Sequence, residues 1–534
     1  MKLRIDIDRT RSIGLSDQIT AQISRMIFEG RIATGLKLPS CRLLARDVGV
    51  SINTVIAAYQ TLQDEQLITA RPRSGFFVRL GPGVHPGLIA QAPAPEKKPA
   101  RIVQKLNLAR RADGIDTIFR PQNWFAQPYP FVCNQISEND FPVAEWRECA
   151  RLAMNRKDLK IWSSDGHYAD SPDLIRQVNQ RILPSRGIAA DPGSTLITLG
   201  SQNGLYLISF LFGGRDRMAA MEDPGYPDAR KILTTNFGSV RFQPVDAEGL
   251  VVDDRLRGVD LVFVTPNRQF PTTVTMSPAR RRALLDAAEE HDFYIVEDDY
   301  ECDVDYRQVP PLSLRAQDDR GRVIYLGSLS KGLSPGLRLG YLNASPDFVA
   351  AARDSRGMIL RHPPIILQQT AAAFVDLGYY DRLLRRLKRD HEQRWRIANA
   401  ALADSLPGLE VVSEFGGTNF LLTDPQRQLQ ADALARAALA RGIVIEAVAP
   451  CYWCRAQGAH RFRIGVSSIG QDRIRPGLAL LADLVAEQRS TGTFSAPPTG
   501  AGLPASASRA PSRKTQCAIL KAGIVTNTAN TSAR

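Results

Sequence analysis

The sequence predicts two folded parts, a small helical domain at the N-terminus and a large α/β domain built on a largely parallel sheet. The chain has 534 residues, too many for one hydrophobic core of typical size. A Pro-, Gly- and Ala-rich stretch without helical or strand period, GPGVHPGLIAQAPAPEKKPA at 81–100, is typical of a linker. Beyond it, the apolar runs TLITLG, LVFVTP, FYIVEDDY and RVIYLGSLS alternate with helix-patterned stretches such as SPARRRALLDAAEEH, which indicates an α/β fold.

These composition changes predict a first domain at 1–80, a linker at 81–114, a large domain at 115–488 and a disordered tail at 489–534, rich in small residues and proline. The longest apolar run, LYLISFLF, is far shorter than the roughly 20 residues of a membrane span. The first residues lack the apolar core of a secretory signal. We therefore expect a cytoplasmic protein without membrane contact.

Net charge and cysteine content are only weak evidence about nucleic-acid and metal binding. The net charge of +13 and pI of about 9.5 are typical of a protein that meets a polyanion, although many basic proteins never bind nucleic acid. Of seven cysteines, only Cys451 and Cys454 have CxxC spacing, with His460 as the one further candidate ligand. A zinc site usually needs a second cysteine pair or two histidines nearby, so reduced thiols are favoured and no metal site is assigned.

The N-terminal domain shows the pattern of a helix-turn-helix followed by a β hairpin. Residues 15–28 carry apolar residues at helical spacing. A second helix is expected between Ser40 and Gly49, and a third begins after Ser51. The segment LITARPRSGFFV then predicts a two-stranded wing. In such a motif the N-terminal turn of the last helix faces base edges, while wing arginines meet phosphates.

Residues 11–80 resemble the GntR family of winged-helix regulators, through LPSCRLLA, VSINTVIAAY and GFFV. The resemblance implies a double-stranded DNA operator as partner. It implies DNA contacts from Arg42, Ser51, Asn53, Thr54, Arg71, Arg73, Ser74 and Gly75. Family members often carry Arg where this chain has Ile52, which removes a possible phosphate or guanine contact.

In the large domain, polar residues follow several predicted strands. Asp298 and Tyr300 come after FYIVE, and the next strand leads into Ser328, Ser330, Lys331 and Arg338. Upstream, Ser201 and Gln202 begin a helix after TLITLG, and Tyr226 lies in the turn MEDPGYP. Ligands of open α/β sheets bind at the carboxyl ends of strands. A lysine, a carboxylate, a phenol and a helix N-terminus are together what pyridoxal 5'-phosphate (PLP) requires.

Residues 115–485 resemble the fold-type I aminotransferases, and most of all the MocR/GabR regulators, in which such a domain follows a GntR-type winged helix. TPNRQFPTT, EDDYEC and GSLSK carry the resemblance. It implies that Lys331 forms the Schiff base with PLP and that Asp298 pairs with the pyridinium. Tyr300 would face the ring oxygen, and Arg463 would bind a ligand carboxylate. The implied phosphate ligands are Ser201, Ser328, Ser330 and Arg338, with Gln202 and Tyr226 also at the cofactor.

Departures from the family pattern lie on the substrate side. The chain has FVCNQISENDFPVAEW and WSSDGHYAD where relatives have Gly- and Pro-rich motifs. Thr273 replaces a glycine, and Asn419 stands where histidine is frequent. These changes predict an altered pocket. The Arg-rich stretch at 382–396 suggests a second DNA site, but a solvated helix linking two lobes, with Leu383, Leu384 and Leu387 inward, is favoured.

Three functions are consistent with these features. The leading hypothesis is a homodimeric, DNA-binding transcription regulator that senses PLP or the aldimine of a small amino-compound effector. The alternative is an active PLP-dependent aminotransferase with an appended DNA-binding module, since one site can serve sensing or turnover. A structural DNA-binding protein with a dead cofactor site is disfavoured by the retained lysine, aspartate and tyrosine.

Overall fold

The computed structural model describes residues 3, 5–9, 13–79, 117–155, 159–163, 169–191, 193–329, 331–491 and 524–526. The chain divides into two compact units, Met1–Leu106 and Asn107–Arg534. The linker predicted at 81–114 and most of the predicted tail lie outside the described residues. Within the described part of the chain, no helix combines the length and apolar character that a membrane span requires.

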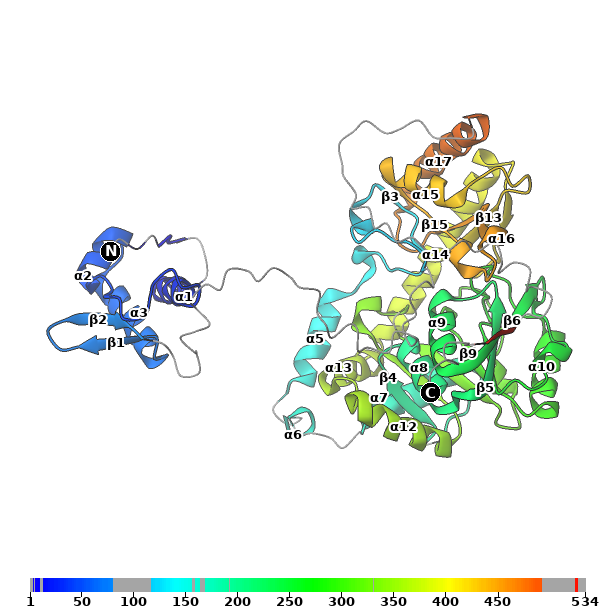
Figure 1. Cartoon of the computed structure of the whole chain (residues 1–534), viewed down its shortest axis with the longest axis horizontal. Coiled ribbons are helices and arrows are strands. Elements are labelled where there is room, and N and C mark those ends of the chain that lie inside the picture. Colours follow the sequence, from blue (N-terminus) through cyan, green and yellow to red (C-terminus); the bar gives the residue numbers. More distant parts are fainter. Residues whose placement is uncertain are drawn as a thin grey trace, which may run out of the picture. The chain divides into compact units, whose positions relative to one another are not determined.

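The N-terminal unit has the three helices and the hairpin that the sequence predicts (Figure 1). Its elements are α1 (Leu15–Phe28), α2 (Cys41–Val48), α3 (Ile52–Asp64), β1 (Ile68–Arg71) and β2 (Gly75–Val78). The Ser40 hydroxyl accepts a hydrogen bond from the Leu43 amide at the start of α2, and Gly49 ends that helix with a φ of +72°. One core of buried side chains, including Ile19, Ile23 and Tyr59, joins the three helices.

The large unit contains a nine-stranded sheet in the order β17-β6-β5-β8-β9-β10-β11-β4, with β7 beside β6. Strands β6, β5, β8, β9 and β10 run parallel, and β11 lies antiparallel between β10 and β4. The prediction of a largely parallel sheet is confirmed. The strands are β4 (Thr195–Thr198), β5 (Gly214–Asp223), β6 (Phe237–Asp246), β7 (Gly249–Leu250), β8 (Leu261–Val264), β9 (Tyr294–Asp298), β10 (Val323–Ser328), β11 (Gly340–Asn343) and β17 (Ile524–Thr526).

Helices cover both faces of this sheet. Successive residues of a strand point to opposite faces, so apolar side chains on both faces are buried against helices. Phe263 and Val296 pack against α8, α9 and α12, whereas Val262 and Ile295 pack against α10. The central strand β8 is therefore apolar and buried along its whole length. The helices of this lobe are α5 (Val143–Ala153), α6 (Leu159–Trp162), α7 (Pro172–Gln177), α8 (Ser201–Phe212), α9 (Pro227–Asn236), α10 (Pro278–Glu290), α11 (Leu314–Gln317), α12 (Pro346–Leu360) and α13 (Ile365–Asp376).

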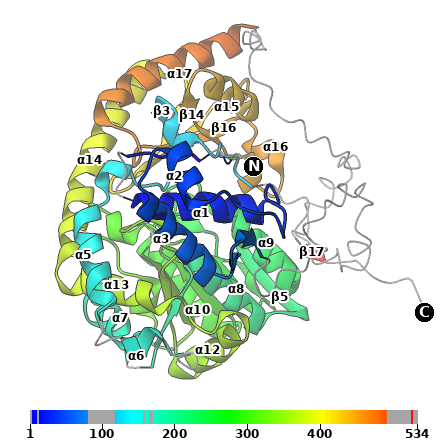
Figure 2. The same cartoon turned by 90° about the vertical axis from the view of Figure 1, so that its left-hand side faces the viewer.

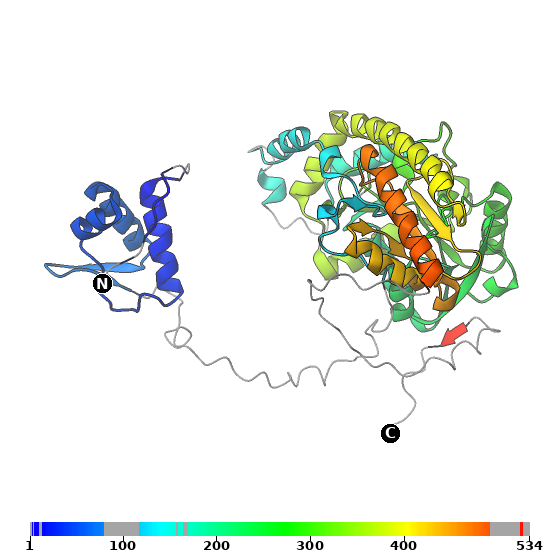
Figure 3. The same cartoon turned by 90° about the horizontal axis from the view of Figure 1, so that it is seen from above.

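A smaller C-terminal lobe has a four-stranded sheet in the order β12-β13-β16-β15. Its elements are β12 (Glu410–Val412), β13 (Asn419–Thr423), α15 (Ala431–Ala440), β14 (Ile443–Val444), β15 (Glu446–Ala447), α16 (Arg455–Gly458), β16 (Arg461–Gly465) and α17 (Gln471–Thr491), with β14 paired to β3 (Tyr129–Pro130). Helix α17, orange in Figure 3, packs along the yellow helix α14 (Tyr379–Ser405). It ends at Thr491, slightly beyond the tail boundary predicted at 489.

Helix α14 contains the Arg-rich stretch and connects the two lobes (Figure 2). Leu383 and Leu387 are buried in the core of the large lobe, and Leu384 packs against that core. Further along the helix, Ala398 and Leu402 belong to the core of the C-terminal lobe. The interpretation of 382–396 as a lobe-linking helix with an inward leucine face is confirmed.

Candidate functional site

A cavity of about 360 Å³ lies at the carboxyl ends of the parallel strands, within the size range of small-molecule sites. Strands β4, β5, β8, β9 and β10 all end at this edge, so the residues that follow them meet there although they are far apart in the chain. The cavity is lined by the predicted residues Ser201, Gln202, Tyr226, Asp298, Tyr300, Ser328, Lys331, Arg338 and Arg463. Ser330 lies outside the described residues.

Lys331 follows β10 and reaches the cavity as an amine of reduced basicity. Its Nζ donates a hydrogen bond to the Asn134 carbonyl oxygen at 3.0 Å. Burial lowers the pKa of Lys331 to about 8, against the opposing effect of the nearby Glu301 carboxylate. A larger fraction of this amine is therefore neutral and nucleophilic near neutral pH than for an ordinary lysine.

Asp298, the last residue of β9, offers a buried carboxylate with an unused oxygen. Its Oδ1 has no hydrogen-bond partner among the described residues, and Asp298 is 7% exposed. Burial, reinforced by Asp299, raises the pKa of Asp298 to about 7. A buried ionised carboxylate is stable only when a cationic hydrogen-bond donor pairs with it. The protonated pyridine nitrogen of PLP is a group of that kind, so this orphaned oxygen fits the cofactor that the sequence predicts.

The N-terminus of α8 offers free backbone amides beside a guanidinium. Gly200 caps α8 with a φ of +78°, and within the described part of the chain no side chain caps this end. A Cβ at Gly200 would come within 3.0 Å of the Arg338 Nη2 atom, so glycine permits the close approach of Arg338. That same nitrogen donates to the Leu199 carbonyl at 3.2 Å. A helix N-terminus with an arginine beside it is suited to a phosphate group.

Aromatic side chains form one wall of the cavity. The ring centroids of Tyr226 and Phe270 lie 5.3 Å apart, and those of Phe270 and Tyr300 lie 6.3 Å apart, both edge to face. The Tyr226 hydroxyl donates to Asp228 at 3.1 Å. Burial raises the pKa of Tyr300 well above its usual range, so its phenol stays protonated and can donate a hydrogen bond to an oxygen of a bound ring.

Arg463, on β16, does not lie alone in the cavity. Its Nε donates to the Glu446 carboxylate at 2.8 Å, and Arg120 binds the other oxygen of that carboxylate at 2.5 Å. Burial alone would raise the pKa of Glu446, but the two guanidiniums more than offset it, so the pKa is lowered. Two cations and one anion leave this corner positive. The sequence prediction missed Arg120 and Glu446, which carry no motif.

Two of the altered substrate-side residues, Asn134 and Asn419, form a hydrogen-bonded chain next to Lys331. The Asn419 amide donates to the Glu301 carboxylate at 2.6 Å and to the Asn134 side-chain oxygen at 3.1 Å. Asn419, noted for replacing a frequent histidine, therefore connects the C-terminal lobe to the residue that accepts from Lys331. Thr273 adopts a φ of +68°, a strained conformation for a β-branched residue and one in which glycine costs least.

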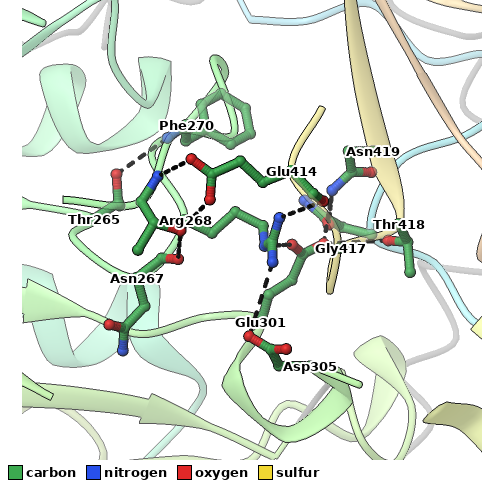
Figure 4. Close-up of polar contacts among 12 residues, drawn as sticks. Thr265, Asn267, Arg268, Phe270, Glu301, Asp305, Glu414, Gly417, Thr418 and Asn419 are labelled. Carbon is green, nitrogen blue, oxygen red and sulfur yellow. Dashed lines mark hydrogen bonds and ion pairs between the residues drawn. The ribbon is translucent and has the colours of Figure 1, made fainter. Parts of the chain in front are cut away.

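Beside this chain, a buried ion-pair cluster ties the two lobes together (Figure 4). Arg268 lies 3.2 Å from the Glu301 carboxylate and 3.8 Å from that of Asp305. It also donates to the Glu414 carbonyl of the C-terminal lobe at 3.4 Å. Gly417 permits this packing, because a Cβ there would lie 2.3 Å from the Arg268 Nη1 atom. The Arg268 guanidinium thus cross-links the two lobes.

In the N-terminal unit, the predicted DNA contacts fall into two groups. Ser51 and Thr54 are engaged at the start of α3, where the Ser51 hydroxyl accepts from the Thr54 amide at 3.1 Å and lies 2.7 Å from its hydroxyl. The other predicted contacts, Arg42, Asn53, Arg71, Arg73, Ser74 and Gly75, are exposed. The Arg71 guanidinium lies 4.5 Å from the centre of the Phe77 ring, and Arg73 occupies the hairpin turn with a φ of +61°.

The CxxC pair contributes nothing to the cavity. Cys451 is buried and Cys454 is half-buried, and neither forms a disulfide bond with another described cysteine. Burial raises the pKa of Cys451 to about 12, which leaves it an unreactive thiol at neutral pH. In the described ranges, no group of three or more His, Cys, Asp or Glu residues is arranged to hold a metal ion.

Comparison with known proteins matches both units to families. Residues 15–78 match the model described as bacterial regulatory proteins, gntR family, and residues 134–479 match aminotransferase class I and II. The HTH-type transcriptional regulator TauR of Rhodobacter capsulatus is 38% identical over 478 residues, covering 88% of this chain and 96% of TauR. The HTH-type pyridoxine biosynthesis transcriptional regulator PdxR of Corynebacterium glutamicum is 27% identical, covering 90% of this chain and 98% of PdxR.

Solved structures agree on the fold of the large unit. An archaeal alanine:glyoxylate aminotransferase superposes with a TM-score of 0.63 and 24% identity, covering 67% of this chain and 90% of that protein. A kynurenine aminotransferase of Pyrococcus horikoshii superposes with a TM-score of 0.62 and 23% identity, covering 76% of this chain and 97% of that protein. The chain therefore belongs to the helix-turn-helix transcriptional regulators that join a gntR-family DNA-binding domain to a domain of the aminotransferase class I and II family.

Proposed function

We propose that the large unit binds PLP at Lys331 and senses an amino compound that also carries an acidic group. The observation that supports this most is the set of groups around one cavity: Lys331, the unpartnered Asp298 oxygen and the uncapped α8 N-terminus beside Arg338. When bound, PLP supplies an electrophilic aldehyde carbon and a conjugated ring. Asp298 would hold the ring nitrogen, Tyr300 the ring oxygen, and Ser201, Ser328 and Arg338 the phosphate, with Ser330 predicted to join them.

The acidic group of the effector would bind at Arg463, in the positive corner made with Arg120 and Glu446. Effector binding would then change the lobe arrangement and with it operator affinity, provided that the effector binds the two arrangements with different free energies. Exposed apolar side chains on α8 and α12, including Phe210 and Met358, support a homodimer that reads paired half-sites. A protein that binds an operator would act in the cytoplasm.

The effector site is tested with Arg463→Lys, which keeps the charge and loses the planar fork. We expect the effector concentration that half-shifts operator binding to rise about 10- to 100-fold, the range for one charge-assisted hydrogen bond. The assay is fluorescence anisotropy of labelled operator DNA with the PLP-loaded protein and a panel of amino acids and aminosulfonates. Arg461→Lys, on the same strand but outside the cavity lining, should respond like the wild type.

Two outcomes would count against the proposal. If Arg463→Lys needs the same effector concentration as the wild type, Arg463 does not bind the acidic group of the effector. Steady turnover of an amino donor with a keto acid at ordinary enzyme rates would instead favour the aminotransferase alternative over sensing.

The rate of PLP loading should depend on pH through Lys331. Only the neutral amine attacks an aldehyde, and the pKa of Lys331 is about 8. The loading rate of the cofactor-free protein should therefore rise about tenfold between pH 6 and pH 7 and level off above pH 8. Stopped-flow absorbance after mixing with PLP measures this rate. A rise that continues to pH 10 would show an ordinary lysine and contradict the assignment.

A further inference from the structure

The outer face of helix α3 carries two exposed isoleucines and no basic residue. Its thirteen residues, INTVIAAYQTLQD, include no Lys or Arg. Ile52 is 44% exposed and Ile56 is 38% exposed, one helical turn apart on the same side. Val55, Tyr59 and Leu62 bury the opposite side in the core of the N-terminal unit. The two isoleucines are therefore not needed to hold the helix in place.

The polar groups on this face are amides. Asn53 and Gln60 are exposed, whereas the hydroxyls of Ser51 and Thr54 bind each other at the helix start. In the major groove, an adenine offers an acceptor and a donor that an amide side chain matches, and its thymine partner offers a 5-methyl group that favours apolar contact. Guanine is best matched by Arg or Lys, which α3 lacks.

Exposed cations lie on the elements before and after α3. Arg42 and Arg46 on α2 and Arg71 and Arg73 on the wing are all exposed, and over residues 1–79 Lys and Arg outnumber Asp and Glu by 12 to 7. This charge suits a polyanion and not an apolar protein surface. The α3 face with the two isoleucines therefore suits DNA, with the cations on phosphates and the helix against base edges.

We propose that Ile52 and Ile56 read thymine methyl groups, so that the operator has A·T pairs where α3 enters the major groove. This rests on the DNA binding of the gntR-family domain and names the bases that it selects. The exposed isoleucines thus serve as specificity residues.

The test replaces single thymines by deoxyuridine, which removes only the methyl group. Operators are first selected from random duplex DNA with the full-length protein. Binding of each substituted operator is then measured at fixed salt. For the wild type, one or two thymines per half-site should each lose about fourfold in affinity without the methyl, the equilibrium value of burying one such group. In Ile52→Ala, the loss should vanish at one of these positions and persist at the others.

Further variants separate the possible results. Ile52→Arg should select guanine at the position where Ile52 reads thymine. Phe28→Ala, which removes a side chain that is 59% exposed at the end of α1, should keep the wild-type uracil profile. The proposal is overturned if no thymine methyl affects binding, or if the profile is the same in the wild type, Ile52→Ala and Ile56→Ala. If the wild type selects no sequence at all, specific DNA reading fails and this inference fails with it.

Discussion

Lys331→Ala should abolish covalent attachment of PLP completely, because no other amine of comparable burial and lowered pKa lines the cavity among the described residues. The visible absorption band of a lysine-linked cofactor should be absent. Borohydride reduction followed by mass spectrometry should find no pyridoxyl adduct. Operator binding without effector should persist, since the N-terminal unit has its own core, while the response to the effector should be lost.

Lys388→Ala is the matched control. Burial also lowers the pKa of Lys388, in α14, but this residue is not part of the cavity lining. It should load PLP like the wild type. A pyridoxyl adduct of undiminished yield in Lys331→Ala would show that the cofactor attaches elsewhere, and the site proposed around β9 and β10 would have to be abandoned.

Arg268→Met should lower the free energy of unfolding of the large unit by about 3–5 kcal/mol, the usual cost of leaving buried charges without their partner. The side chains of Arg268, Glu301 and Asp305 are 4%, 6% and 8% exposed, so water cannot replace the lost guanidinium. Methionine keeps most of the side-chain length and limits the cavity. Urea denaturation followed by tryptophan fluorescence measures the change.

Two comparisons make this result specific. Arg396→Met breaks an exposed pair with Glu392 on α14 and should change stability by about 1 kcal/mol or less. Combining Arg268→Met with Glu301→Gln removes one stranded carboxylate and should recover part of the loss. If the double variant is as unstable as the two single losses added together, the ion pair is not the source of the effect.

The sequence also indicated where the pocket would differ from that of relatives, but not how. Asn419 and Thr273 were recognised as departures from a family pattern. The structure assigns Asn419 a specific partner set, Glu301 and Asn134, and shows Thr273 in a left-handed backbone conformation. A pattern reports that a residue type is unusual, whereas the contacts and dihedral angles that explain it depend on segments folded from elsewhere in the chain.

The sequence by itself determined the elements and the order of the cofactor residues. Apolar patterns predict the N-terminal helices and strands β4, β8, β9 and β10, and capping residues such as Ser40 and Gly49 mark helix ends. Polar residues after β4, β9 and β10 must meet because these strands end at one edge of the sheet. Only the tertiary structure decided the neighbours of Lys331 and Arg463. Asn134 is 197 residues from Lys331, and Arg120 is 326 residues from Glu446. Such contacts leave no periodic or local signal, because they form only when segments far apart in the chain fold together.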